Sequence, residues 1–349
     1  MKKKFFLIIS IFVVLCSTGC SPKSQGIKKI TDCSGDVVEV PLKIDKVICV
    51  DQSCCAFLVS MGLEEKLIGV HGSTLYSSWT PIFLNDNYAS LKKYGYNPSA
   101  EAIYEAQTDL VILNDANYAK ELRSLGVPAI YFGYKNMEEL FYAVDMLGEI
   151  FGGNHSEFTT CWKKEVNQTI NSITSKLVEV DESKKRNVYY INASNNPSNL
   201  YSTFGGNSFV EEWINIIGAN LITSSYENIN SINSEEILKL NPDTIIIGGY
   251  AEHSRKEELI TDPLWKEITA VLNNEIFLLP TSFAPYEKFS VELPLLFKFS
   301  VSCLFPDMFD FDFEKEMETF YKEFYNLELT KEQLNYLVNG LNSDGSRMD

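Results

Sequence analysis

The chain has 349 residues and a formal net charge of −17, and 45% of its residues are hydrophobic. Nucleic acids are poor partners for such a chain, because phosphate backbones require a basic protein face. The same charge disfavours binding to anionic lipid through a polybasic patch. The length exceeds that of one usual domain, so the composition indicates a globular protein with two cored domains.

The N-terminal segment has the pattern of an export signal. Three lysines precede an apolar run at 5–15, and small residues lead to Cys20. A basic start, a short apolar core and small residues before a cleavage site are typical of a secretory signal peptide. The run is too short to cross a bilayer, which requires roughly 20 residues.

The small residues directly before Cys20 also match the bacterial lipoprotein pattern, in which the cysteine is lipidated and becomes the new N-terminus. We therefore predict a signal peptide over 1–19, a lipid on Cys20 and a flexible tether over 20–26. These features place the mature chain at the cell membrane, on its extracytoplasmic face. Ser17 stands where a leucine is commoner, so release of an unanchored protein stays open.

Short apolar runs alternate with helical patterns over 27–153, the predicted first lobe. Strands are expected at 47–50, 67–70, 109–113 and 128–132. Helices are expected at 54–61, 100–106, 121–125 and 137–151. Short buried strands separated by helices are typical of a parallel sheet with helices on both faces.

A long amphipathic helix separates this lobe from the next. Residues 156–180 contain no glycine or proline, and apolar side chains recur there at steps of three and four, which is the helical period. Such a helix is roughly 35 Å long, about the diameter of a small domain. We predict that residues 154–182 form a rigid α-helix that joins the two lobes.

The strand and helix pattern restarts over 183–340, the predicted second lobe, and the polar residues 341–349 are expected to be a disordered tail. One segment repeats between the lobes, because Glu101 and Glu235 each stand in the first turn of a helix that leads to an aspartate and a buried strand. The predicted fold class is therefore α/β, with two Rossmann-like lobes joined by one long helix and a ligand cleft between the lobes.

Several segments together resemble the substrate-binding proteins of ABC importers for iron–siderophore, haem and cobalamin-type ligands. They occur in the family's order: TDCSGDVVEVP at 31–41, KVICV at 46–50, MGLEEKLIGV at 61–70, DPLW at 262–265 and LFPDMF at 304–309. The resemblance implies a ligand held between two lobes, and an ABC permease with its ATPase as partners. We expect the binding protein itself to be a monomer.

In this family one exposed glutamate on each lobe pairs with arginines of the permease, and the resemblance implies this role for Glu101 and Glu235. A carboxylate can accept two parallel hydrogen bonds from a guanidinium, which fixes orientation as well as attraction. Glu236 stands beside Glu235 and is an alternative in the second lobe. A merely solvated helix N-terminus is the competing interpretation of both sites.

Candidate ligand contacts are polar and aromatic side chains in loops after predicted strands, because clefts of such folds lie at strand ends. Tyrosine and tryptophan provide apolar area with a polar handle, which suits a planar or chelated ligand. The candidates are His71, Trp79, Tyr94, Tyr96, Asn114, Tyr118, Tyr134, Asn192, Tyr201, Phe204, Tyr250 and Tyr286. For each aromatic residue, packing within a lobe is the competing interpretation.

The ligand is less constrained than the fold. Only three histidines occur, without metal-ligand spacing, so neither a protein-held metal nor a resident cofactor is predicted. His71 is the one candidate axial ligand for haem or a corrinoid. We expect an iron complex (a siderophore or haem) or a related metal chelate, with a corrinoid, or ligand sensing without transport, as alternatives. No nucleophile-elbow, phosphate-loop or dinucleotide motif occurs, so an enzyme is not expected.

Overall fold

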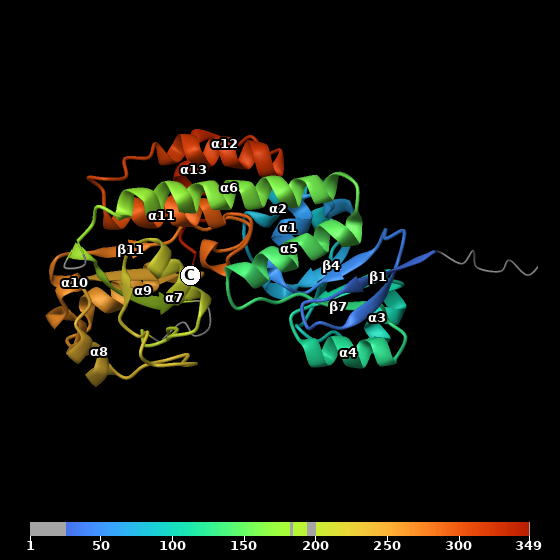
Figure 1. Cartoon of the computed structure of the whole chain (residues 1–349), viewed down its shortest axis with the longest axis horizontal. Coiled ribbons are helices and arrows are strands. Elements are labelled where there is room, and N and C mark those ends of the chain that lie inside the picture. Colours follow the sequence, from blue (N-terminus) through green and yellow to red (C-terminus); the bar gives the residue numbers. More distant parts are fainter. Residues whose placement is uncertain (1–25, 182–183, 194–199, 349) are drawn as a thin grey trace, which may run out of the picture.

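The structure, a computed structural model, describes residues 26–181, 184–193 and 200–348. Two α/β lobes lie side by side, and helix α6 (Asn154–Leu177) runs along both of them (Figure 1). Cys20 and the predicted signal peptide lie outside the described residues, so lipidation stays a prediction. Within the described ranges, no helix combines the length and apolarity that crossing a membrane requires.

The N-terminal lobe is built on a five-stranded parallel sheet with the strand order β5-β4-β3-β6-β7. Its strands are β3 (Val47–Cys49), β4 (Leu67–His71), β5 (Lys92–Tyr94), β6 (Leu110–Leu113) and β7 (Ala129–Tyr131). Its helices are α1 (Gln52–Ser60), α2 (Thr80–Leu84), α3 (Ala100–Ala106), α4 (Ala116–Ser124) and α5 (Met137–Phe151), with short 3-10 helices η1 (Glu64–Lys66), η2 (Gly72–Leu75) and η3 (Asn85–Ser90). The central strands β3 and β6 are fully buried, because helices cover both faces of the sheet.

The C-terminal lobe contains a four-stranded parallel sheet with the order β11-β10-β8-β9. Its strands are β8 (Asn187–Asn192), β9 (Asn220–Leu221), β10 (Thr244–Gly248) and β11 (Ile276–Leu278). Its helices are α7 (Phe209–Ile216), α8 (Ser234–Leu240), α9 (Glu252–Thr261), α10 (Thr269–Leu272), α11 (Leu293–Leu304), α12 (Phe313–Tyr325) and α13 (Lys331–Val338), with 3-10 helices η5 (Trp265–Glu267) and η6 (Tyr286–Lys288).

Both sheets reverse their strand order beside the first strand of the lobe. Strands β4 and β6 flank β3, and strands β9 and β10 flank β8. Such a reversal separates the loops that leave the carboxyl ends of two neighbouring strands, and ligands of open α/β sheets bind in the resulting crevice. The predicted α/β class with two Rossmann-like lobes is therefore confirmed, and each lobe directs one switch point towards the boundary.

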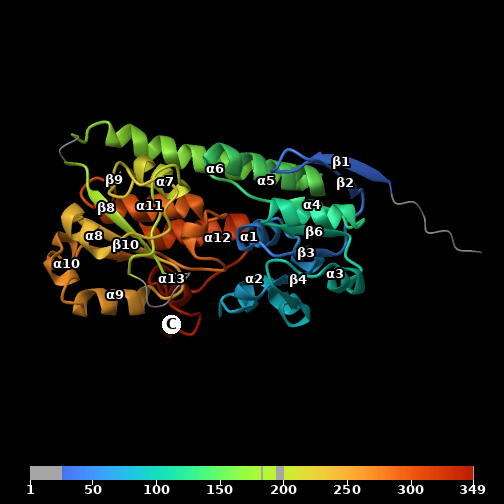
Figure 2. The ribbon, with the colours of Figure 1, turned by 90° about the horizontal axis from the view of Figure 1, so that it is seen from below.

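Helix α6 packs on α5 of the N-terminal lobe and on α11 of the C-terminal lobe (Figure 2). Trp162, Val166 and Ile173 form its fully buried face. The Trp162 indole donates a hydrogen bond of 2.9 Å to the Val291 carbonyl, which belongs to the C-terminal lobe. The single long helix expected between the lobes is thus present, and its 24 residues, ending at Leu177, span about 36 Å.

The repeated aspartate after each glutamate-bearing helix has a structural reason. Asp109 Oδ2 accepts hydrogen bonds from the Asp45 and Lys46 amides at 2.8 and 2.9 Å, directly before β3. Asp243 Oδ2 accepts one from the Asn187 amide at 3.0 Å, at the start of β8. In each lobe the aspartate therefore holds the first strand in register with its neighbour.

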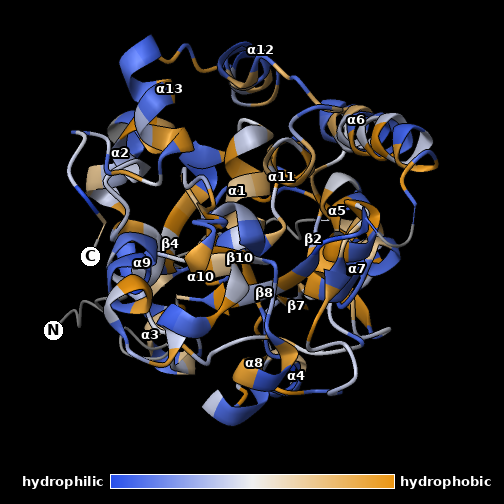
Figure 3. Ribbon diagram, turned by 90° about the vertical axis from the view of Figure 1, so that its left-hand side faces the viewer, coloured by the Kyte–Doolittle hydropathy of each residue, from blue (hydrophilic) through white to orange (hydrophobic). Residues whose placement is uncertain are grey.

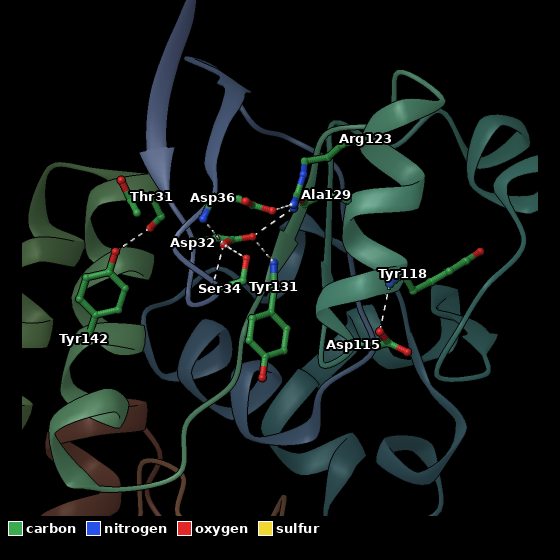
Figure 4. A network of polar contacts seen from close by, with 10 residues as sticks. All are labelled: Thr31, Asp32, Ser34, Asp36, Asp115, Tyr118, Arg123, Ala129, Tyr131 and Tyr142. Carbon is green, nitrogen blue, oxygen red and sulfur yellow. Dashed lines mark hydrogen bonds and ion pairs between the residues drawn. The ribbon is translucent and has the colours of Figure 1, made fainter.

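An N-terminal hairpin, β1 (Ile27–Thr31) with β2 (Val37–Pro41), is fastened to the N-terminal lobe by the fully buried Asp32 (Figure 4). Asp32 accepts a hydrogen bond from the Tyr131 amide at 3.2 Å, at the end of β7. It also forms an ion pair with Arg123 of α4 at 3.1 Å. The aspartate of the opening TDCSG motif is therefore explained by packing of the hairpin.

The C-terminal tail, expected to be disordered, is packed over its described part. Leu341 and Arg347 form an antiparallel bridge, and the Leu341 carbonyl accepts a hydrogen bond of 2.9 Å from Trp79 Nε1. Ser343 Oγ donates to the Ser78 carbonyl at 3.0 Å. The prediction of disorder was wrong because short polar side chains here close a turn with backbone groups instead of facing water.

Candidate functional site

The lobes contact each other through segments that follow the carboxyl ends of several strands. Ser53, in the first turn of α1, donates a hydrogen bond of 2.8 Å to the Lys288 carbonyl. The Tyr134 hydroxyl donates to the same carbonyl at 2.8 Å. Gln52 donates to the Tyr250 hydroxyl across the same boundary. The 3-10 helix η6 of the C-terminal lobe is therefore held against the first turn of α1 and the loop after β7.

A cavity of about 490 Å³ lies beside this contact. Its volume is within the usual range for ligand sites, roughly 300–1,000 Å³. Among the described residues, three of the N-terminal lobe and eleven of the C-terminal lobe line it: Ser53, Tyr134, Lys135, Tyr190, Asn192, Phe204, Asn207, Ser208, Phe209, Val210, Asn228, Glu287, Lys288 and Phe289. An adjoining hollow of about 680 Å³ shares Lys135, Asn207 and Ser208 with it. This cavity, lined by both lobes, is the candidate ligand site.

Two glycines shape the wall that Phe204 forms. A Cβ added at Gly205 would overlap the Tyr226 carbonyl oxygen, and one added at Gly206 would overlap the Ser224 carbonyl oxygen. Only glycine allows two backbone segments to approach so closely. The Gly-Gly pair therefore serves backbone packing, and it places the neighbouring Phe204 ring against the cavity.

The inner wall of the cavity contains a buried acidic group. Glu287 lines the cavity and is 6% exposed, and Glu252, at the start of α9, is fully buried. A Cβ added at Gly248 would lie 3.0 Å from Glu287 Cδ and 2.9 Å from the Tyr190 hydroxyl. The carboxyl group and the phenol therefore converge on the end of β10. Among the described residues, neither the Tyr190 hydroxyl nor Glu252 Oε2 has a hydrogen-bond partner.

Burial determines the protonation of this group. It raises the pKa of Glu252 well above its usual value, and the nearby Glu287 carboxyl adds to the effect. Burial likewise raises the pKa of the Tyr190 phenol, again with contributions from Glu287 and Glu252. Neighbouring buried carboxyl groups resist simultaneous ionisation. We therefore expect Glu252 to be protonated.

The rest of the wall is apolar, with basic groups at its rim. The Phe209 and Phe289 rings stack with centroids 4.0 Å apart. Lys135 is exposed and Lys288 is half-buried, and both line the cavity. Within the described part of the chain, no three histidine, cysteine, aspartate or glutamate side chains converge as metal ligands. The arrangement suits an organic molecule with both polar and apolar faces.

Three of the predicted ligand contacts line the cavity: Tyr134, Asn192 and Phe204. Asn192 is 4% exposed at the end of β8, and the Phe204 ring stacks on Tyr190 with centroids 6.1 Å apart. They come from three separate segments that follow or end a strand. Their contact with a ligand stays a prediction, but the structure brings them together around one space.

Five predicted contacts pack against other parts of the protein instead: Trp79, Tyr94, Tyr118, Tyr201 and Tyr286. Tyr286 is fully buried, and its hydroxyl lies 2.8 Å from that of Tyr321. The Tyr201 ring lies 5.7 Å from that of Trp265. Position after a strand did not distinguish these residues from cavity residues, because the sequence does not show which loop side chains find packing partners within the protein.

Four other candidates lie outside the cavity: His71, Tyr96, Asn114 and Tyr250. The His71 ring stacks on Tyr96 with centroids 3.8 Å apart, and its Nδ1 lies 2.7 Å from Ser73 Oγ. Burial, together with the Lys93 charge, lowers the pKa of His71. An axial ligand for haem or a corrinoid would have to project into the cavity, whereas His71 does not line it.

Tyr190 and Glu287, which make the inner wall polar, are not among the residues predicted from the sequence. Side chains two apart on a strand share a face, so the predicted Asn192 pointed to Tyr190. Glu287 directly follows the predicted Tyr286, but no pattern indicated which of the two side chains would face the cavity.

Helices α3 and α8 lie on the same side of the molecule, opposite α12 (Figures 1 and 3). Glu101 and Glu235 are in their first turns and are exposed. Neither carboxylate has a hydrogen bond or ion pair with another residue of the described ranges. Glu236, by contrast, accepts a hydrogen bond of 2.6 Å from Tyr226 and pairs with Lys239. Glu235 is therefore the more available carboxylate of the second lobe.

Two α/β lobes, one helix along both and a cavity between them define a solute-binding protein. The family described as periplasmic binding protein matches residues 47–282, and the chain belongs to this family. The predicted family is thereby confirmed.

Relatives and solved structures agree with this assignment. The chain is 22% identical over 295 residues to the uncharacterized ABC transporter substrate-binding lipoprotein YvrC of Bacillus subtilis, covering 78% of this chain and 86% of that protein. It is 22% identical over 286 residues to the high-affinity heme uptake system protein IsdE of Staphylococcus aureus, covering 78% and 88%. A periplasmic solute binding protein from Veillonella parvula has the same fold, with a TM-score of 0.74, 22% identity and coverage of 91% and 99%.

Proposed function

We propose that the protein captures an iron complex (a siderophore or haem) or a related metal chelate outside the cytoplasm and delivers it to an ABC permease with its ATPase. The proposal depends above all on the cavity of about 490 Å³ that both lobes line. Its stacked phenylalanines suit the apolar surface of a chelate, and its lysines and carboxyl group suit polar substituents. The family and the heme-uptake relative support the same ligand class. A corrinoid is the alternative ligand.

A lipid on Cys20 and docking through Glu101 and Glu235 are parts of this proposal. Tethering at the membrane would raise the effective concentration of the protein near its permease. The two exposed carboxylates on one side of the molecule are available to arginines of the permease. Mass spectrometry of the membrane fraction tests the anchor, since an unmodified N-terminus after cleavage would contradict it.

A thermal-unfolding panel tests the ligand class. The mature chain is heated with haem, cobalamin, a ferric trihydroxamate or a nickel–histidine complex. A ligand at 100 times its Kd adds about 2.7 kcal/mol to the free energy of unfolding, which is a shift of several degrees. We expect one chelate class to raise the Tm, and no response to any of the probes would contradict the proposal. A response without loss of uptake on deletion of the protein would favour a sensor.

A further inference from the structure

The cavity has an uneven distribution of charge along its depth. Its charged lining residues are Lys135, Glu287 and Lys288. Glu287 is 6% exposed, whereas Lys135 is exposed and Lys288 is half-buried. The acidic group therefore lies at the inner wall, and the two basic groups lie towards the solvent.

The inner wall also presents a phenol that the described protein residues leave unsatisfied. Tyr190 is fully buried and lines the cavity, and its hydroxyl has no hydrogen-bond partner among those residues. The hydroxyl and the Glu287 carboxyl group approach the same point above Gly248. Buried polar groups are rarely left without a partner in folded proteins. A polar group of the ligand is the natural partner at this point.

A second buried carboxyl group strengthens the demand for a hydrogen-bond donor. Glu252 is fully buried beside Glu287, and its Oε2 has no hydrogen-bond partner within the described ranges. Repulsion from Glu287 contributes to its raised pKa, so the two carboxyl groups are close enough to interact. A cationic group at the cavity wall would be attracted to these carboxyl groups, whereas an anionic group would be repelled by them.

We infer that the inner end of this cavity binds a protonated amine, or a comparable cationic hydrogen-bond donor, that the ligand carries beside its metal chelate. The Glu287 carboxylate and the Tyr190 hydroxyl oxygen accept hydrogen bonds from this group. Lys135 and Lys288 face the oxygen-rich remainder of the ligand. The inference rests on the proposed function and narrows its ligand to chelates with an ammonium group. An anionic substituent, such as a haem propionate, is repelled by Glu287 and directed to the rim.

Two probes that differ only in this charge test the inference. One is a linear ferric trihydroxamate with a terminal ammonium group, and the other is the same chelate with that amine acetylated. Quenching of the intrinsic fluorescence of the mature chain measures both Kd values at one pH and salt concentration. We expect the ammonium form to bind about tenfold tighter or more, as a charge-assisted hydrogen bond predicts.

Substitutions in the inner wall test whether it causes the difference in affinity between the two chelates. Glu287→Gln keeps the size of the side chain and should abolish the preference for the ammonium form, while Tyr190→Phe should reduce it by about two- to fivefold. Glu121→Gln makes the same exchange at an exposed position of α4 and should preserve the full preference. Unfolding curves of the ligand-free variants show whether each one is folded before its affinity is compared.

The outcomes separate this inference from the proposed function. Equal affinity of the wild-type protein for the two chelates, or a preference that survives Glu287→Gln, overturns the inference and leaves the proposed function standing. Failure of both chelates to bind also overturns the inference. In that case a thermal shift with haem or cobalamin preserves the proposed function, and its absence with every probe overturns that too.

Discussion

The two lobes share one architecture but contribute unequally to the space between them. Each has a parallel sheet whose strand order reverses beside its first strand. Of the fourteen described residues that line the cavity, eleven nevertheless belong to the C-terminal lobe, and three, Ser53, Tyr134 and Lys135, belong to the N-terminal lobe. Two lobes of the same architecture can therefore differ in how much of a shared cavity each one lines.

Packing of the loops explains the difference. In the N-terminal lobe, His71 is stacked on Tyr96, and Trp79 is fully buried with its indole bonded to the C-terminal tail. These side chains are occupied within the protein. In the C-terminal lobe, the glycines at 205 and 206 bring two backbone segments together and leave Phe204 at the cavity. Loop packing, more than the number of aromatic residues, therefore determines which lobe lines most of the cavity.

The largest expected effect concerns the exposed glutamate that each lobe carries in the first turn of a helix. The double change Glu101→Arg with Glu235→Arg should abolish uptake of the chelate that gives a thermal shift, and leave its Kd unchanged. Each change replaces a carboxylate, which would pair with a permease arginine, by a positive charge that repels the same arginine. Cellular uptake and the Kd of the purified protein measure the two effects. Glu105→Arg, also exposed on α3, is the control, and normal uptake in the double variant would contradict docking.

A pair of glycine substitutions tests the unequal packing of the loops. Gly205→Ala should lower the free energy of unfolding by about 2–3 kcal/mol, because its Cβ would overlap the Tyr226 backbone. Gly95→Ala in the N-terminal lobe meets nothing within 4 Å and should change it by less than about 0.5 kcal/mol. Urea unfolding of both variants makes the comparison. Similar stabilities of the two variants would show that the close approach of the Gly205 and Tyr226 backbones does not require glycine.

A smaller, pH-dependent effect is expected on the N-terminal side of the boundary. Burial raises the pKa of Asp51 from 3.8 to about 7. The folded state therefore loses stability as the pH rises from about 4 to 7, because the unfolded chain releases this proton first. Asparagine caps a helix as well as aspartate does and does not ionise. The free energy of unfolding of Asp51→Asn, relative to that of the wild type, should therefore rise by about 2–3 kcal/mol between pH 5 and pH 8. Unfolding at both pH values measures this gain, and a pH-independent difference would contradict it.

The smallest expected effect compares one hydroxyl in each lobe. Tyr94 in β5 and Tyr190 in β8 both have a buried hydroxyl without a hydrogen-bond partner in the described ranges. Replacing either tyrosine by phenylalanine should stabilise the ligand-free protein by up to about 1 kcal/mol, because an unsatisfied polar group is removed. Only Tyr190→Phe should also reduce stabilisation by the chelate, since Tyr94 does not line the cavity. If the chelate raises the Tm of both variants equally, a contact between Tyr190 and the ligand is contradicted.

Local patterns in the sequence were sufficient to predict most of the fold. The apolar run at β6 and the three- and four-residue spacing of α6 identify a buried strand and a long helix, since both depend on neighbours in the chain. The candidate site was less predictable. Tyr134 and Trp79 both follow strands, yet only Tyr134 lines the cavity. The direction in which a loop side chain packs depends on partners distant in sequence, such as the tail that covers Trp79.

The continuous helix along both lobes has a consequence for partner selection. Helix α6 has 24 residues without glycine or proline, and it packs on α5 of the N-terminal lobe and on α11 and α7 of the C-terminal lobe. The separation between Glu101 and Glu235 therefore depends on the length of this helix, and one added turn of four residues would change that length by about 6 Å. A permease with two arginine sites at a fixed spacing would accept only binding proteins of matching dimensions, so the length of α6 would itself be a determinant of specificity.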